Sequence, residues 1–400
     1  MSTIYDPPIS GGPGQPPPPA PWFGPGGPGG PEGPAGYGGG EGPGKPTRRF
    51  PRGLLAVAAA GAVGLATFWG LSAAGVTSGN KVLTTSQIAA QTDPGLVDIY
   101  TTLGYQHAQA AGTGMVVSPT GEVLTNNHVI NGATSIKARD VGNGRTYQAK
   151  VVGYDHSHDI AVLQLQGASG LETVDLGDSN SASVGQKVVA LGNALGKGGT
   201  PAVATGHVAG LGAAITASDA GAGTSERLTG LIHHNAGIQP GDSGGPLVNT
   251  AGEVIGINTA ASQGVQFRGQ QTEGFAIPIN QAVSLAQQIE SGDASATVHI
   301  GPTAFLGVEI MSADSAAANG VQAGAGATVA GVLPGAPAER AGLAQGDVIV
   351  SVDGNRISSP EGLQSALGRH HPGDSVTIGW ADAAGQTRSA TVVLATGPAA

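Results

Sequence analysis

The chain has 400 residues, which is enough for two or three domains that each bury a core. Its formal net charge is −10 and only 11% of its residues are charged, which argues against a general role in nucleic-acid binding. Because the chain contains no cysteine, disulfides, thiolate catalysis and cysteine-ligated zinc are excluded.

The N-terminal segment has the composition of a low-complexity tail. Residues 1–46 contain 14 Pro and 15 Gly, and such a segment buries too little apolar surface to offset the entropy cost of ordering its backbone. We therefore expect residues 1–46 to form a disordered tail.

Residues 47–76 combine a basic flank with an uncharged apolar run. The run extends from Gly53 to Val76 and follows Arg48, Arg49 and Arg52. About 20 helical residues cross a hydrocarbon core of roughly 30 Å, so the run is long enough to span a membrane. The basic flank predicts a cytoplasmic N-terminus, with everything after Val76 on the other side. A cleaved signal peptide is the alternative, but the run exceeds the usual apolar region of roughly 7–15 residues.

Short apolar runs separated by turns dominate the next two hundred residues. Residues 77–93 lack periodicity and are expected to be a tether, whereas 94–290 read as one domain made of many short strands, which is typical of an all-β sandwich or barrel. The clearest expected strands are Tyr147–Tyr154, Ile160–Leu165, Gln186–Leu191, Ala202–Leu211 and Glu253–Asn258. Apolar residues in Gln281–Glu290 have near-helical spacing and predict a closing helix. A small-residue linker (291–300) and a second domain (301–396), with a short helix near 360–368, complete the chain.

The motif Gly241-Asp242-Ser243-Gly244-Gly245-Pro246-Leu247 carries a candidate nucleophile. A serine hydroxyl becomes nucleophilic only beside a base and a site for developing negative charge. The glycines allow a sharp turn that directs backbone N–H groups at a substrate carbonyl. A plain Gly/Ser turn is the alternative from composition alone. The stretch resembles the active-site segment of chymotrypsin-fold serine proteases, with Ser243 as the nucleophile.

A serine hydrolase also needs a histidine and, usually, an acid that orients it. His128 stands in Thr125-Asn126-Asn127-His128-Val129-Ile130, a segment that resembles the histidine motif of the HtrA family of serine proteases. Two aspartates are candidates for the acid: Asp159, directly before the apolar run Ile160-Ala161-Val162-Leu163, and Asp155, in a Gly-Tyr-Asp turn. The family pattern favours Asp159, because it places the acid immediately before such a run.

The resemblance to the HtrA family covers roughly residues 94–396 and implies a fold and a site. It implies a mainly β chain with two six-stranded antiparallel barrels, followed by a small α+β domain and preceded by the disordered tail and one transmembrane helix. The oxyanion hole is expected at the N–H groups of Gly241 and Ser243. Gly237 and Ile238 are expected to line the specificity pocket, which would then suit small or medium apolar side chains. The resemblance also places a sensor loop at Ala213–Glu226.

One residue departs from the family pattern. The family's usual residue before the nucleophile is Asn, whereas this chain has Asp242. In digestive relatives an aspartate there pairs with a new N-terminus, and the sequence gives Asp242 no obvious partner. The activation of this site is therefore an open question at the level of the sequence.

The last hundred residues resemble a PDZ domain. Phe305-Leu306-Gly307-Val308 matches the loop whose N–H groups bind a peptide carboxylate, and the peptide would add as a strand beside Glu309-Ile310. The expected partners are therefore protein substrates and peptide C-termini.

Taken together, the motifs predict a membrane-anchored serine endopeptidase that acts outside the cytoplasm on misfolded or specific proteins. No cofactor, metal or nucleic acid is expected, since His156-x-His158 and His233-His234 have no clear further ligands. The resemblance suggests a homotrimer. Two alternatives remain at this stage: a catalytically silent PDZ adaptor or chaperone, and a structural anchor of the cell envelope.

Overall fold

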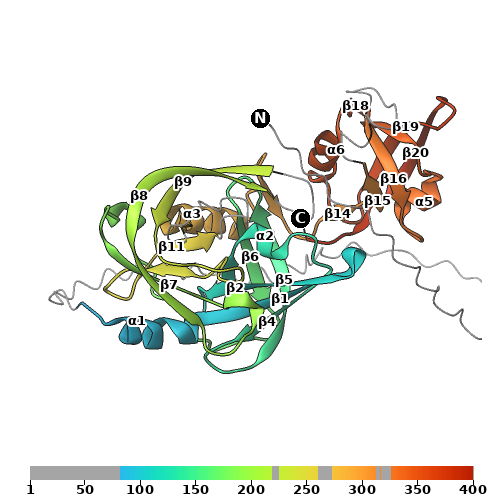
Figure 1. Ribbon diagram of the computed structural model, residues 1–400. Coiled ribbons are helices and arrows are strands. Elements are labelled where there is room, and N and C mark those ends of the chain that lie inside the picture. Colours follow the sequence, from blue (N-terminus) through green and yellow to red (C-terminus); the bar gives the residue numbers. More distant parts are fainter. Residues whose placement is uncertain (1–81, 219–224, 260–272, 312–315, 317–325, 400) are drawn as a thin grey trace, which may run out of the picture. The chain divides into compact units, whose positions relative to one another are not determined.

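The computed structural model describes residues 82–218, 225–259, 273–311, 316 and 326–399 (Figure 1). The expected tail (1–46) and the expected membrane span (53–76) lie outside these residues. Among the residues that are described, no helix is long and apolar enough to cross a membrane.

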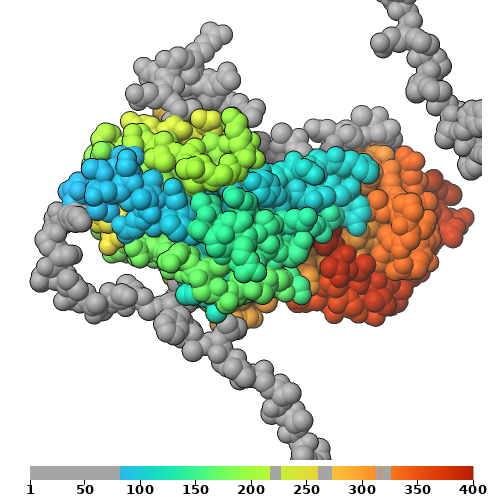
Figure 2. All heavy atoms as spheres, turned by 90° about the horizontal axis from the view of Figure 1, so that it is seen from below, coloured from blue at the N-terminus to red at the C-terminus, as the bar shows by residue number. Residues whose placement is uncertain are grey.

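The first described element is a helix, α1 (Thr85–Thr92), where the sequence suggested a tether. The Thr84 hydroxyl accepts a hydrogen bond from the Gln87 N–H, and the Gln87 side chain accepts one from the Thr84 N–H. This capping box starts the helix although its apolar residues are few. Ile88 is 1% exposed and belongs to the core, so the tether interpretation is wrong for this stretch. Figure 2 shows these first described residues, coloured blue, at the surface beside residues coloured green.

The first sheet of the predicted protease domain contains β1 to β6 and one later strand, β13. Its order is β13-β5-β4-β1-β2-β3-β6, and β6 also pairs with β5, so the pairings of β1 to β6 return to their start. The expected strands Tyr147–Tyr154 and Ile160–Leu165 are confirmed. The strands are β1 (Leu96–Leu103), β2 (Ala108–Val116), β3 (Glu122–Thr125), β4 (Ser135–Asp140), β5 (Thr146–Asp155) and β6 (Ile160–Leu165).

The second sheet is a closed six-stranded barrel with the order β10-β11-β12-β9-β8-β7. Its strands are β7 (Lys187–Gly192), β8 (Ala202–Ser218), β9 (Ser225–His234), β10 (Pro246–Val248), β11 (Val254–Thr259) and β12 (Gly274–Pro278). β8 and β9 pair as far as Ser218 and Ser225. Most of Ala213–Glu226 is therefore strand and not loop. Three register shifts along this pair break the regular alternation of buried and exposed side chains by which a strand is recognised in a sequence.

The helix α3 (Ile279–Glu290) confirms the expected closing helix and begins two residues before the expected start. Its buried positions, Ile279, Ala282, Ala286 and Ile289, are spaced three or four residues apart and lie in a core cluster shared by strands of both sheets. The next segment was expected to be a linker, but its last residues form β13 (Val298–Ile300), which pairs with β5. The linker expectation is therefore wrong for these three residues.

Five short helical segments precede or connect the strands of the two sheets. They are η1 (Asp93–Gly95), η2 (Gly104–Gln106), α2 (Asn127–Ile130), η3 (Ser179–Ser181) and η4 (Ala194–Gly196). Of these, α2 carries His128, and η4 lies next to the turn that carries Ser243. Both matter for the site described below.

The C-terminal domain has an α+β fold with its own core, as expected. β15 (Val308–Ile310), β16 (Ala327–Val332), β17 (Val348–Val352), β19 (Ser375–Ala381) and β20 (Thr387–Val393) form its main sheet in that order. β18 (Asn355–Arg356) pairs with β17, and β14 (Ala304–Phe305) pairs with β21 (Ala395–Thr396). The helices α5 (Pro337–Ala341) and α6 (Pro360–Leu367) complete it, and α6 confirms the expected helix. The core includes Leu306, Ile349, Leu363 and Trp380.

Candidate active site

His128 lies in α2, directly after β3, and contacts Asp159 through two atoms. Its ring Nδ1 is 2.8 Å from Asp159 Oδ2, and its backbone N–H donates to Asp159 Oδ1 at 2.9 Å. An ionised carboxylate only accepts hydrogen bonds, so Nδ1 is the donor in this pair. Nε2 is then the basic nitrogen of the neutral ring. The His128 side chain is 40% exposed, while that of Asp159 is 2% exposed.

Asp159 occupies the last position of the turn between β5 and β6 and adopts a left-handed backbone, with φ of 55°. Asn126 donates from its side-chain amide to the Asp159 carbonyl oxygen at 3.0 Å. Thr259, at the end of β11 in the second barrel, donates to Asp159 Oδ2 at 3.2 Å. The carboxylate therefore receives hydrogen bonds from α2 and from β11.

The other candidate acid, Asp155, has a different neighbour. Its carboxylate contacts His158, at 3.0 Å to both the backbone N and ring Nδ1 of that residue. The geometry therefore separates the two aspartates: Asp159 is the one beside His128.

Ser243 lies close to the histidine-bearing helix. The Thr113 N–H on β2 donates to the Ser243 carbonyl oxygen at 2.8 Å. At the preceding residue, Gly112, an added Cβ would lie 2.6 Å from a methyl group of Val129 in α2 and 3.3 Å from the Ser243 carbonyl oxygen. Only a glycine fits there, because β2 passes between α2 and the serine turn. The structure thus brings His128, Asp159 and Ser243 into one region.

The backbone of the serine turn is held at three successive carbonyl groups. The Pro240 oxygen accepts from the Leu195 N–H in η4 at 2.6 Å, and the Asp242 oxygen accepts from the Gly245 N–H at 3.0 Å. Between them, the Gly241 oxygen accepts from the Thr113 hydroxyl at 2.7 Å. In a trans peptide the N–H points opposite to the carbonyl. The N–H directions of Gly241 and Ser243, the expected oxyanion donors, are therefore fixed.

Gly241 needs its glycine for two reasons. Its φ of 99° disfavours any side chain. An added Cβ would also collide with the Asn193 carbonyl oxygen. The same Asn193 donates its N–H to the Thr113 hydroxyl at 2.8 Å. Because that hydroxyl donates to the Gly241 oxygen, the loop after β7 helps to hold the serine turn.

Asp242 has a backbone partner in this structure. Its Oδ2 accepts from the Gln239 N–H at 2.8 Å, and its own N–H donates to the Gln239 oxygen at 3.0 Å. Among the described residues, its buried Oδ1 has no hydrogen-bond partner. Burial raises the pKa of the Asp242 carboxyl, and the Gln239 bond opposes that rise only in part. Asp242 therefore bonds back to Gln239 through both its side chain and its backbone, which holds the serine turn closed.

The two expected pocket residues lie on the approach to this turn. Ile238 is 6% exposed and packs in a core cluster of the second barrel, and its N–H donates to the Ala236 oxygen at 2.8 Å. Gly237 is half-buried. Their role in a specificity pocket remains a prediction.

The expected carboxylate-binding loop of the C-terminal domain is anchored on α5. Leu306 is 1% exposed in the core, and its carbonyl oxygen accepts from the Ala338 N–H at 2.9 Å. Gly307 has φ of 82°, and a Cβ there would collide with Ala336. Phe305 ends β14, and Val308 begins β15, which is the edge strand of the sheet as far as the described residues go.

Sequence reasoning missed three supporting residues, Thr113, Asn126 and Thr259. Thr113 stands in a Gly-Thr-Gly segment of β2, and Asn126 adjoins the histidine motif. Their roles depend on contacts across 12 to 128 residues of sequence, for which no local pattern exists. In the part of the chain that is described, no group of three or more potential metal ligands comes together.

Comparison with known proteins gives two domain families. Residues 112–257 match the trypsin-like peptidase domain family, and residues 304–382 match the PDZ domain family. Both matches fall on the two domains seen in the structure.

Several curated proteases match more than two thirds of the chain. The chain is 39% identical over 278 residues to the periplasmic serine endoprotease DegP of Escherichia coli, which covers 68% of this chain and 55% of that protein. It is 35% identical over 325 residues to the serine protease PepD of Mycobacterium tuberculosis, covering 77% and 65%. The chain thus spans about 55% to 65% of the length of these relatives. A solved structure, the HtrA-type protease AlgWS227A with a tripeptide, is 32% identical over 80% of this chain and 99% of its own, with a TM-score of 0.45.

Proposed function

Since the chain belongs to the HtrA family of serine proteases, we propose that it is a serine endopeptidase with Ser243 as nucleophile, His128 as general base and Asp159 as the orienting acid. The observation that carries the proposal is the two-atom contact of His128 with the buried Asp159, at 2.8 and 2.9 Å, beside the serine turn. A silent adaptor would have no need to keep this pair.

The reaction follows from the hydrogen bonds described above. With Nδ1–H held by Asp159, His128 Nε2 takes the Ser243 Oγ proton as Oγ bonds to the substrate carbonyl carbon. The carbonyl oxygen gains the negative charge, and the N–H groups of Gly241 and Ser243 stabilise it. Nε2–H then gives its proton to the leaving amine nitrogen as the C–N bond breaks. Water repeats the sequence on the acyl-enzyme and releases Ser243.

Cleavage of a protein substrate tests this assignment. Ser243→Ala removes the nucleophile from a side chain that is 5% exposed, so the fold should persist while casein cleavage by the purified protein ceases. Circular dichroism and the melting temperature provide the control for folding. Casein cleavage by Ser243→Ala at the wild-type rate would refute the assignment.

We further propose that the C-terminal domain binds peptide C-termini. β15 is the edge strand among the described residues, and an edge strand presents unpaired backbone groups to which a peptide can add. The carboxylate would bind at the backbone of Phe305, Leu306, Gly307 and Val308. Protein substrates with accessible apolar C-termini are the expected partners, and the family resemblance implies a homotrimer, which light scattering would test.

The proposed location is the outer face of a cell membrane, with residues 53–76 as an uncleaved single-pass anchor and residues 1–46 in the cytoplasm. The support is the length of the uncharged run and the basic residues that precede it. The proposed domain limits are 94–290 for the protease domain, with α1 packed against it, and 301–396 for the PDZ domain. Its substrates would be misfolded or specific extracytoplasmic proteins.

A further inference from the structure

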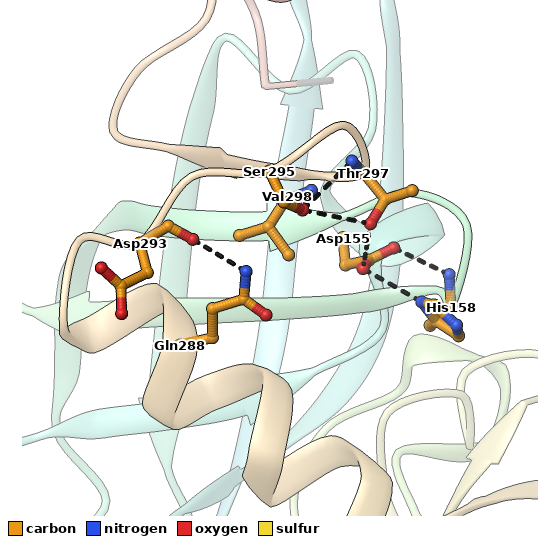
Figure 3. Close-up of polar contacts among 7 residues, drawn as sticks. All are labelled: Asp155, His158, Gln288, Asp293, Ser295, Thr297 and Val298. Carbon is orange, nitrogen blue, oxygen red and sulfur yellow. Dashed lines mark hydrogen bonds and ion pairs between the residues drawn. The ribbon is translucent and has the colours of Figure 1, made fainter.

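The turn that carries Asp159 contains a second histidine–aspartate pair with the same contact pattern as the first. Asp155 Oδ1 accepts from the His158 N–H, and Asp155 Oδ2 contacts His158 Nδ1, both at 3.0 Å (Figure 3). In the same way, Asp159 contacts the backbone N and the ring Nδ1 of His128. His158 directly precedes Asp159, so whatever holds His158 also holds the backbone of the acid.

The backbone at Asp159 needs such a restraint. Its left-handed φ of 55° is unfavourable for a residue with a side chain unless neighbouring contacts hold it. Its carboxylate is committed to His128 and Thr259, and its N–H reaches the His156 oxygen only at 3.3 Å. The Asn126 amide holds the Asp159 carbonyl oxygen, so the contacts of His158 supply the restraint on the peptide that precedes Asp159.

Asp155 is in turn held by the segment that follows α3. The Thr297 hydroxyl donates to Asp155 Oδ2 at 2.9 Å, and the Asp155 side chain is 0% exposed. Val298, the first residue of β13, pairs with Asp155 in the sheet. The Ser295 hydroxyl accepts from the N–H groups of Thr297 and Val298, which orients this short turn toward Asp155 (Figure 3).

We propose that Asp155, His158 and Thr297, called here the acid-turn clamp, are positioning residues that keep Asp159 in place for catalysis. This inference rests on the proposed function and deepens it. The segment between α3 and β13 thereby acts on the catalytic acid through Asp155 and His158, without touching His128 or Ser243 in any contact described above. Loss of the clamp should lower kcat and leave substrate binding unchanged.

Two single substitutions in the full chain remove the clamp's outer contacts, and each has a conservative partner. His158→Ala deletes the ring, whereas His158→Asn keeps a side-chain N–H near the Nδ1 position. Thr297→Val deletes the hydroxyl, whereas Thr297→Ser keeps it. We expect kcat to fall about tenfold in His158→Ala and Thr297→Val, which is less than the roughly 10²-fold cost of a 1 Å misplacement. KM should stay within about twofold, and the conservative variants should recover most of kcat.

The matched control is Gln288→Ala. The Gln288 amide donates to the Asp293 oxygen at 2.8 Å and ties down the same segment without contact to the acid turn (Figure 3). Wild-type kcat is expected for this variant. Equal losses in Gln288→Ala and Thr297→Val would show that the segment acts only through general stability and would overturn the proposal.

Hydrogen exchange of the His128 backbone N–H, which donates to Asp159 Oδ1, tests the clamp independently of activity. Its exchange should accelerate about tenfold in His158→Ala and Thr297→Val and stay at the wild-type rate in His158→Asn, Thr297→Ser and Gln288→Ala. Unchanged exchange and unchanged kcat in His158→Ala and Thr297→Val would overturn the proposal. If the wild-type chain fails to cleave protein, the proposed function fails, while the exchange rates still decide whether the clamp positions Asp159.

Discussion

At the scale of single residues, the proposed site depends on which of two aspartates contacts His128. Asp155 and Asp159 stand four residues apart, at the two ends of the turn between β5 and β6, and each contacts the backbone N and ring Nδ1 of a histidine. Only Asp159 contacts His128, which lies beside the serine turn. We therefore propose separate roles for the two carboxylates, one in orienting the base and one in supporting the turn.

Substitution of the two aspartates should separate these roles. In Asp159→Asn, the amide can donate to Nδ1 and favour the wrong tautomer of His128, and kcat should fall by a factor on the order of 10⁴. Asp155→Asn should cause a smaller loss, because His128 keeps its acid. Steady-state cleavage of a reporter peptide measures both. A larger loss in Asp155→Asn than in Asp159→Asn would mean that the acid is misassigned.

His234 should make the stability of the second barrel depend on pH. Burial, aided by the neighbouring His233, lowers its pKa to about 4 from the usual 6.5. Because the folded-state pKa is depressed, the unfolded chain binds the proton more readily. The contribution of neutral His234 to the free energy of unfolding is fully present above pH 6.5. It is lost as the pH falls toward 4. The loss has an upper limit of about 3 kcal/mol.

The comparison of wild type with His234→Leu isolates this effect. Asp93 acts in the opposite sense over part of the range, since burial raises its pKa to about 6, but it is common to both proteins. Urea unfolding between pH 7 and pH 4 should show a steeper loss of stability in the wild type. Parallel curves for the two proteins would contradict the assignment to His234.

At the scale of elements, the sequence predicts strands and helices well where a single period persists. β6 matches its expected range, and α3 and α6 agree within two residues. Residues Ala213–Glu226, most of which belong to the β8–β9 pair, were expected to form a loop. The strand pattern is hidden there because register shifts break the alternation of buried and exposed side chains. β13 has only three residues, and its pairing with β5 depends on a partner more than 140 residues away.

The helix α1 is the element whose energetic role differs most from the sequence-based expectation. Ile88 is 1% exposed within the core, so Ile88→Ala should lower the free energy of unfolding by about 2–4 kcal/mol, as is usual for such truncations. Ser86→Ala, at an exposed position of the same helix, serves as the control and should change little. Urea denaturation measures both variants. An Ile88→Ala midpoint equal to that of the wild type would show that α1 does not contribute to the core.

At the scale of the whole molecule, the residues of the proposed site could be singled out from the sequence, whereas the contacts that support them could not. His128, Asp159 and Ser243 stand in recognisable motifs. The contacts that hold them, from Thr113, Asn126 and Thr259, cross between segments far apart in the chain. The partner of Asp242 proved to be the Gln239 backbone, three residues before it. Pro240-Gly241 is itself a turn signal in the sequence, but it does not predict that the Asp242 carboxylate folds back onto that turn.

The proposed anchor can be tested on the intact protein. An uncharged run of 24 residues behind a basic flank should resist cleavage and hold the protein in the membrane. Mass spectrometry of the mature protein from a membrane fraction should then find residues 1–46 still attached. A mature N-terminus near Gly75 would instead identify a signal peptide.

The account as a whole depends on Ser243 being an activated nucleophile. The most direct measurement is reaction of the full chain with a fluorophosphonate, followed by mass spectrometry of the labelled peptide. We expect a single modification at Ser243, no modification in Ser243→Ala, and a much slower reaction in Asp159→Asn. A folded wild-type protein that does not react, or that reacts at another serine, would contradict the account.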